Sequence, residues 1–241
     1  MKKQPRKAVI LLGFDSADPT GSAATSCSDN TVLQKAVQKA VTEALAAGLK
    51  ELIFVTADSR TPVEAQVGSL REGAICGPAS SEGACEVARP ERVVIARQFA
   101  ARGLGQALCE IRHLLEEEPF VVMLPHEMTA GGSEGSTAEL IATFKACGGC
   151  LVSVKDTFML EQDGCFAAIA RAAAGRYLLQ PAVLDVLEED PEGGLSGALL
   201  LLAEAWPVTA LPVPALHGGD VAQQPAGFAA EADATRLEAA E

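Results

Sequence analysis

Continuous apolar runs alternate with amphipathic stretches along the chain. Six short apolar runs rich in β-branched residues are predicted to form strands at residues 7–13, 51–56, 92–98, 119–125, 150–155 and 206–213. Four of them are expected to be buried parallel strands, because they are continuously apolar rather than alternating. Between the runs, residues 30–48, 105–118 and 136–149 carry apolar side chains at helical spacing. This alternation predicts a three-layer α/β/α sandwich with a mostly parallel central sheet and right-handed crossovers.

Local signals refine the ends of these elements and the organisation of the chain. Gly48 is a helix-stop signal, and Ser136 and Glu139 have the spacing of a capping box. Residues 57–91 are rich in Gly, Ser, Ala and Pro, which predicts an irregular excursion from the sheet. We therefore expect one α/β domain over residues 1–217, followed by an acidic, Ala-rich tail or helix over residues 218–241.

Composition is that of a globular protein. The chain has 241 residues, 49% of them hydrophobic, and a mean hydropathy of +0.20, which is enough to bury a sizeable core. No run approaches the ~20 apolar residues of a membrane-spanning helix, and the apolar stretch near the start is too short for a signal peptide. These features predict a cytoplasmic protein.

The charge balance restricts the class of partner. The formal net charge is −13 and the pI is near 4.7. Nucleic acid and anionic membranes are therefore poor partners. A phosphorylated ligand would need local positive charge or a metal ion.

The cysteines give little indication of disulfides or of a metal site. There are seven, an odd number without regular spacing, which is typical of a reducing compartment. Only Cys147-Gly148-Gly149-Cys150 has the spacing of a redox or zinc motif, and it lacks a second Cys or His pair. We favour a Gly-Gly turn between a helix and a strand.

Several strings occur in the order found in a known family. They are "KAVI" at 7–10, "EALAAGLKELIFVT" at 43–56, "RGLGQAL" at 102–108, "EPFVVMLP" at 118–125, "GRYLLQPAVLDVLE" at 175–188 and "GG" at 193–194. In this order the chain resembles the bacterial UTP-glucose-1-phosphate uridylyltransferases, which are sugar-nucleotide pyrophosphorylases, over about two thirds of its length. The resemblance implies a Rossmann-like nucleotidyltransferase fold of the GT-A-like type. It does not by itself establish activity.

The segment after the first strand differs strongly from the phosphate loop of this family. The family pattern implies a G-x-G-T-R loop after the first strand, where this chain has Phe14-Asp15-Ser16-Ala17-Asp18, and no base occurs between Lys7 and Lys35. A carboxylate about 4 Å from a phosphate costs on the order of 4 kcal/mol at an effective dielectric constant of 20. Side chains in place of glycine also keep backbone amides from the ligand.

The metal-binding position has changed as well. Where the family pattern implies L-P-D-D, with Mg²⁺ on the first Asp, this chain has Leu124-Pro125-His126-Glu127. Imidazole is a poor Mg²⁺ ligand. His126, Glu127 and Asp220, with His217, could converge and hold Mg²⁺ or a transition metal. We favour the alternative, that both histidines are neutral polar residues lining a relic cleft. We therefore assign no cofactor, and Mg²⁺ or a transition metal is expected only if the protein is active.

The sugar side and the nucleoside side differ in what they retain. The family's V-E-K-P string is missing, and Leu195 and Leu200 stand where the resemblance implies acids after Gly193-Gly194. The helix predicted to contain both leucines is apolar, which indicates that it packs against the rest of the protein or against a partner. By contrast, Gln98 and Gly103-Leu104-Gly105 match the region that contacts base and ribose. "GLG" is equally consistent with a tight turn before a helix.

Three hypotheses follow. The first is a catalytically impaired or inactive pseudoenzyme that acts as a regulatory, scaffolding or sugar-nucleotide-sensing subunit, bound to a protein partner or to itself. The second is a divergent, metal-assisted nucleotidyltransferase that makes a UDP-glucose-like nucleotide sugar. The third is a self-associating structural subunit. The losses at separate strands favour the first, because each of them removes phosphate-handling chemistry.

Overall fold

A single mixed sheet forms the centre of the computed structural model. The structure describes residues 3–12, 30–56, 89–98, 103–125, 136–154, 173–191, 194–203 and 205–212. The strands lie in the order β3-β2-β1-β4-β6-β5-β7. Their bounds are β1 Lys7–Leu12, β2 Glu51–Thr56, β3 Arg92–Arg97, β4 Phe120–Met123, β5 Cys150–Val154, β6 Ala173–Leu179 and β7 Val208–Pro212. The six strands expected from the sequence are all present.

One strand runs against the others. β6 pairs antiparallel with both β4 and β5, whereas the remaining neighbours are parallel. The apolar pattern did not predict β6, because Gly175 and Arg176 interrupt its apolar run. A register shift between Val152 and Val154 accompanies the pairing with β5. There the Ser153 hydroxyl donates a hydrogen bond to the carbonyl of Arg176.

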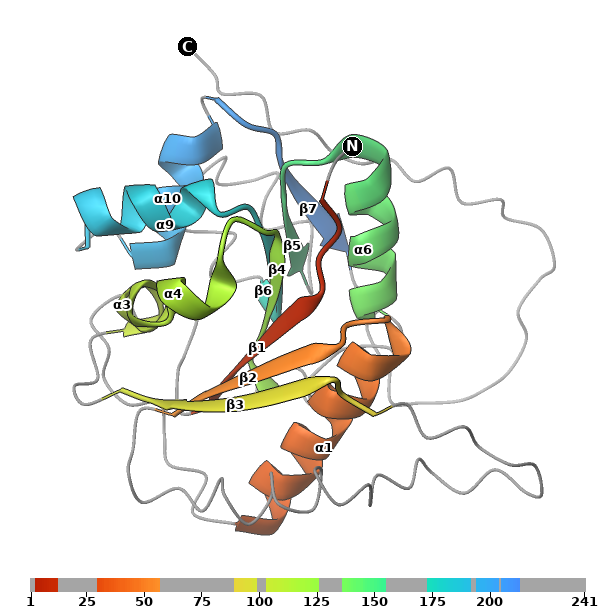
Figure 1. The fold of residues 1–241 in the computed structure, drawn as a ribbon. Helices are drawn as coiled ribbons and strands as arrows, with labels where there is room; N and C mark the ends of the chain where they lie inside the picture. Colours follow the sequence, from red (N-terminus) through yellow and green to blue (C-terminus); the bar gives the residue numbers. More distant parts are fainter. Residues whose placement is uncertain are drawn as a thin grey trace, which may run out of the picture.

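Helices cover both faces of the sheet (Figure 1). On one face lie α1 Asn30–Ala46 and α6 Ser136–Cys147, and on the other lie α3 Gly103–Glu110, α4 Arg112–Leu115, α9 Ala182–Glu189 and α10 Gly194–Ala203. Alternate residues of β1 serve the two cores: Val9 and Leu11 face the second set of helices, and Ala8 and Ile10 face the first. The predicted three-layer α/β fold is therefore confirmed.

The helix expected over 105–118 is divided in two. Ile111, with φ −96° and ψ 8°, separates α3 from α4, and its side chain is buried. After α4, the Lys7 ammonium donates a hydrogen bond to the carbonyl of Leu115 at 3.1 Å and pairs with Glu116. A cation at the C-terminal end of a helix is favourable, since the carbonyls there are unpaired.

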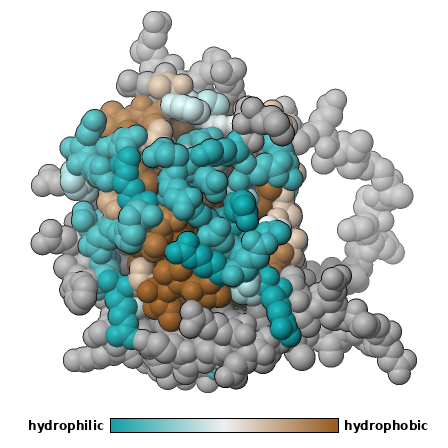
Figure 2. Space-filling model, in the orientation of Figure 1, coloured by the Kyte–Doolittle hydropathy of each residue, from teal (hydrophilic) through white to brown (hydrophobic). Residues whose placement is uncertain are grey.

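The surface on the side shown in Figure 2 is mostly hydrophilic, with hydrophobic groups reaching it between the polar side chains. Two of the large exposed apolar side chains, Leu200 and Leu201, lie on α10, whose residues Leu195, Leu199 and Leu202 are buried. Within the described ranges, no helix combines the length and the apolar character needed to cross a bilayer. The expected excursion over 57–91 lies almost wholly outside these ranges, and the tail over 218–241 lies entirely outside them.

A buried ion pair joins three elements on the α1/α6 face. The Arg176 guanidinium in β6 donates to both carboxylate oxygens of Glu43 in α1, at 2.7 and 2.8 Å. The backbone amide and the hydroxyl of Thr137, in α6, donate to the same carboxylate. All three residues are buried. Burial raises the pKa of Glu43, but Arg176 and Thr137 together outweigh this and leave that pKa below its usual value of 4.5.

Removing this carboxylate should destabilise the fold strongly. Glu43→Gln leaves the Arg176 charge buried without a counter-charge, so we expect a loss of about 3–5 kcal/mol in the free energy of unfolding, measured by denaturant titration. Because the folded pKa of Glu43 is lowered, the pair contributes stability above about pH 4.5 and loses it as the pH falls. The control is Glu91→Gln, whose exposed carboxylate pairs with Arg6 and Lys50, with a much smaller expected loss. Equal losses in the two variants would contradict the argument.

The Cys147–Cys150 motif forms a helix-to-strand turn. α6 ends at Cys147, β5 begins at Cys150, and Gly148 and Gly149 have φ of +76° and +80°. A Cβ at Gly149 would overlap the backbone oxygen of Pro207, the residue before β7. The Gly-Gly pair thus permits both the left-handed turn and a close backbone approach.

Alanine substitutions at Gly48 and Gly149 distinguish the need for a left-handed backbone from the need for a close backbone approach. Gly48 also has a positive φ (+84°), but a Cβ there meets nothing within 4 Å. We expect Gly48→Ala to lower the free energy of unfolding by about 1–2 kcal/mol through backbone strain alone. Gly149→Ala should cost clearly more, because strain and overlap add. Thermal and denaturant unfolding measure both variants, and a similar cost for the two would refute the close approach.

Candidate functional site

The carboxyl ends of the parallel strands meet at one edge of the sheet. β1 ends at Leu12, β2 at Thr56, β3 at Arg97 and β4 at Met123, and all four run in the same direction. In open α/β sheets, ligands bind outside these ends. The loops expected to carry phosphate and metal chemistry leave the sheet at this edge.

Gln98 is placed directly at this edge. Its backbone amide donates to the carbonyl of Thr56 at 3.0 Å, which extends the β2–β3 pairing by one residue. Its side chain is 5% exposed, and neither the amide nitrogen nor the amide oxygen has a hydrogen-bond partner among the described residues. A buried amide without partners costs about 1–3 kcal/mol. Such an arrangement suits a ligand that offers one donor and one acceptor.

Gly103, Leu104 and Gly105 form the first turn of α3. Gly103 has φ +88°, so it accommodates a sharp entry into the helix. Leu104 is buried in the core shared with α9 and α10. A Cβ at Gly105 would lie 2.8 Å from Leu187 Cδ2 and 3.6 Å from the Cα of Gly194. Gly105 therefore lets α3 approach α9 and the start of α10, a packing role that exists without any ligand.

The proposed metal ligands lie outside the described residues. His126 and Glu127 follow Pro125, where the described chain stops after β4, and His217 and Asp220 follow β7 beyond Pro212. In the ranges that the structure does describe, no group of three or more His, Cys, Asp or Glu side chains is placed to hold a metal ion. Asp15 and Asp18 of the loop after β1 also fall outside these ranges.

The buried positive charges of the described core, on Arg176 and Lys7, are paired with other groups of the fold. Arg176 lies opposite Met123 near the carboxyl end of β4, but Glu43 holds its guanidinium through two nitrogens. Lys7 begins β1, at the opposite edge, and binds the end of α4. Neither side chain replaces the arginine and lysine that the loop lacks.

The two cysteines of the turn differ in environment. Cys147 is exposed, whereas Cys150 is buried and its pKa is raised to about 11, mainly by burial. A thiol with a raised pKa carries little thiolate at neutral pH and is a weak nucleophile. The structure thus supports a turn rather than a redox motif.

Comparison with known proteins gives a consistent set of relatives, although no protein-family model matches the chain. The UTP--glucose-1-phosphate uridylyltransferase of Haemophilus influenzae is 26% identical over 195 residues, covering 65% of this chain and 66% of that protein. That of Streptococcus pyogenes is 25% identical, covering 65% and 62%. The chain is thus similar in sequence to uridylyltransferases of this family. It spans just under two thirds of the length of these relatives.

Several solved structures share the fold of this chain. A UTP-bound UGPase from Acinetobacter baumannii has a TM-score of 0.60 at 19% identity, covering 88% of this chain and 87% of that chain. A UDP-glucose pyrophosphorylase complexed with UDP-glucose has a TM-score of 0.57 at 16% identity, covering 88% and 92%. The nucleotidyltransferase-like fold inferred from the sequence is therefore confirmed.

Substitution at Gly105 distinguishes its packing role from a ligand contact. In Gly105→Ala, overpacking against Leu187 costs about 1–3 kcal/mol, partly offset by a gain of up to about 1 kcal/mol in helix propensity. We expect a small net loss of stability and unchanged ligand affinity of the folded protein. Gly197→Ala in α10, where a Cβ meets nothing within 4 Å, should be neutral or stabilising. Weakened nucleotide binding in Gly105→Ala alone would instead indicate a ligand contact.

Proposed function

We propose that this chain binds a sugar nucleotide through its nucleoside part and has lost, or nearly lost, the transfer reaction named for its relatives. The unpartnered Gln98 amide at the carboxyl edge carries the nucleoside half of the proposal. A uracil ring offers an N–H donor beside a carbonyl acceptor, which complements a glutamine side chain. Binding would satisfy both orphan atoms at once.

The sequence of the β1 loop supports the loss of catalysis. Attack of a sugar phosphate oxygen on a nucleotide α-phosphate, with release of pyrophosphate, needs cations and backbone amides that stabilise charge on the phosphoryl oxygens. Here Asp15 and Asp18 stand in the loop, and the first base after Lys7 is Lys35. A binding site that uses a neutral amide for the base tolerates this change better than one that stabilises a transition state.

The biological role that fits this chemistry is a sensing, regulatory or scaffolding subunit. The exposed Leu200 and Leu201 of α10 offer an apolar contact for a protein partner or for a second copy of the chain. Light scattering, with and without UDP-glucose, tests self-association.

Gln98→Leu tests the nucleoside site. The variant replaces the amide by an apolar side chain of similar size, which cannot form hydrogen bonds to the base. We therefore expect the affinity for UDP-glucose to fall at least about tenfold. Stability without ligand should be unchanged or higher, because a buried unpartnered amide is lost. Calorimetry measures the affinity, and thermal unfolding measures the stability.

Gln38→Leu, at an exposed position of α1, is the matched control and should bind as the unsubstituted protein does. Absence of UDP-glucose and UTP binding at millimolar concentration would refute the proposal. A pyrophosphate-release assay with UTP, glucose 1-phosphate and Mg²⁺ decides the catalytic half. Turnover that disappears in His126→Ala or Asp220→Ala would establish the metal-assisted enzyme instead.

A further inference from the structure

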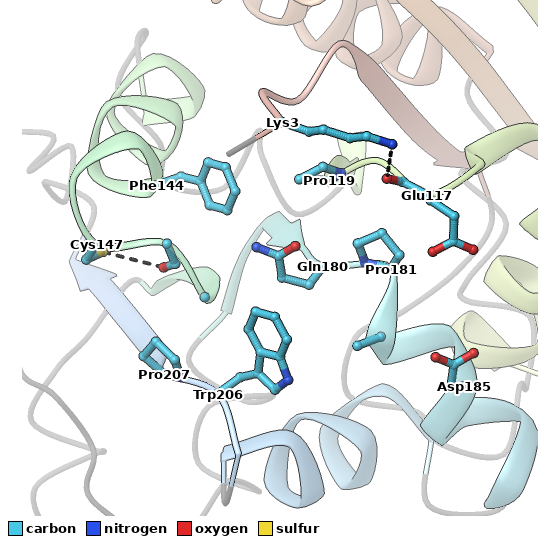
Figure 3. A pocket seen from close by; sticks show the side chains of 13 residues that line it. Lys3, Glu117, Pro119, Phe144, Cys147, Gln180, Pro181, Asp185, Trp206 and Pro207 are labelled. Atoms are coloured by element: carbon cyan, nitrogen blue, oxygen red, sulfur yellow. Dashed lines mark hydrogen bonds between the residues drawn. The ribbon is translucent and has the colours of Figure 1, made fainter. Parts of the chain in front are cut away.

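A cavity lies at the edge of the sheet opposite to that of Gln98. Its lining comes from the segments that precede β4, β5 and β7 and from the end of the antiparallel β6, all of which meet at the amino edge of the parallel strands (Figure 3). Its volume is about 510 Å³. That lies within the range of about 300–1,000 Å³ that small-molecule sites occupy. No single stretch of the sequence indicates this cavity, because its walls come from separated stretches of chain.

The cavity has an aromatic and proline-rich wall. Trp206 is 44% exposed, and its backbone amide donates to the carbonyl of Leu202 at 2.7 Å, so the end of α10 holds the residue in place. Pro207 lies beside the indole, and Phe144 and Pro181 line the cavity farther from it, beyond Gln180. An indole ring held open to solvent beside a cavity presents a flat apolar platform that the core does not use.

Polar groups of both signs surround this platform. Figure 3 shows the Gln180 amide extending into the middle of the cavity, with Trp206 on one side and Lys3 on the other. The Lys3 ammonium donates to the backbone carbonyl of Glu117 at 2.9 Å. The Glu117 carboxylate has no ion-pair partner among the described residues, and the Asp185 carboxylate is paired with Arg112.

This combination selects the chemical class of the ligand. The Glu117 carboxylate repels an anion and the Lys3 ammonium repels a cation, while Asp185 is already paired with Arg112, so the charges here favour neither sign of ligand. A neutral ring bearing several hydroxyl groups suits all of these groups, because each hydroxyl both donates and accepts hydrogen bonds. Its C–H face can lie flat on the indole while its hydroxyls reach the amide, the ammonium and the carboxylate.

We propose that this cavity is a saccharide-binding site, separate from the nucleotide edge, in which Trp206 is the stacking platform and Gln180 the central hydrogen-bonding group. The parallel strands between the two edges are four to six residues long, or about 13–20 Å at the usual rise per residue. A ligand here is therefore a free sugar or the end of a glycan, and not the sugar of a nucleotide bound at Gln98.

Trp206 is the single tryptophan of the chain, so its fluorescence reports directly on the cavity. Titration with glucose, galactose, maltose and sucrose should produce a saturable change in emission for at least one of them. Benzoate and tetramethylammonium, a charged aromatic anion and a charged cation, should produce none. No saturable change with any of the four sugars up to about 100 mM, where a site has little binding free energy, would overturn the proposal. So would binding of a charged probe in preference to every sugar.

Gln180→Leu keeps the fluorophore and should weaken sugar binding at least about tenfold, because the central hydrogen bonds are lost. The control is Glu110→Gln, an exposed carboxylate on α3 that does not line the cavity, with unchanged affinity. Trp206→Ala, followed by calorimetry, should abolish binding with little change in thermal unfolding. Equal affinity in Gln180→Leu and in the unsubstituted protein would refute the assignment even if Trp206→Ala failed to fold.

Gln98→Leu separates the two proposals. It should reduce UDP-glucose affinity and leave the fluorescence titration with sugar unchanged. A sugar response that disappears in Gln98→Leu would place the sugar at the nucleotide edge and overturn the second site.

Discussion

The buried Arg176–Glu43 pair is the constraint on which the rest of the structure depends. Among the described strands, β6 is the one that runs against its neighbours, and it carries Arg176 into the layer between the sheet and the helices α1 and α6. A guanidinium without solvent needs a fixed counter-charge. Glu43 supplies it from α1, and Thr137 of α6 donates two hydrogen bonds to the same carboxylate. The position of β6 is therefore tied to these two helices by a buried charge and its partner.

This use of charge limits what the carboxyl edge can do. Arg176 reaches the vicinity of that edge, yet its hydrogen bonds to Glu43 direct it into the core. The chain as a whole is strongly acidic, and its β1 loop is acidic as well. Among the described residues at this edge, the buried side chain whose polar atoms lack partners is the neutral amide of Gln98, on which the proposed recognition rests. A neutral amide can select a base, but it cannot stabilise the charge that develops in phosphoryl transfer.

Much of the fold could be predicted because its information is local. Six strands could be predicted because each is a short apolar run, whereas β6 could not. Arg176, which is paired across the core, interrupts the apolar run of β6 in the sequence. The division between α3 and α4 at Ile111 was missed for a related reason, because the side chain keeps helical spacing while the backbone turns. For the site, Gln98 came from a resemblance, and only the structure shows that its amide is buried without partners. The Trp206 cavity is non-local throughout, so no single segment could indicate it.

The residues that hold the fold are distinct from those that would perform the reaction. Arg176, Glu43 and Lys7 lie in the described core or at the amino end of β1, and none of them belongs to the β1 loop. Substitutions in that loop therefore need not disturb the buried pair or the helix end that Lys7 binds. In this architecture catalytic chemistry can be lost one loop at a time while the sheet persists. A neutral binding function at the retained carboxyl edge places fewer demands on the loops than transfer does, and the acidic β1 loop is compatible with it.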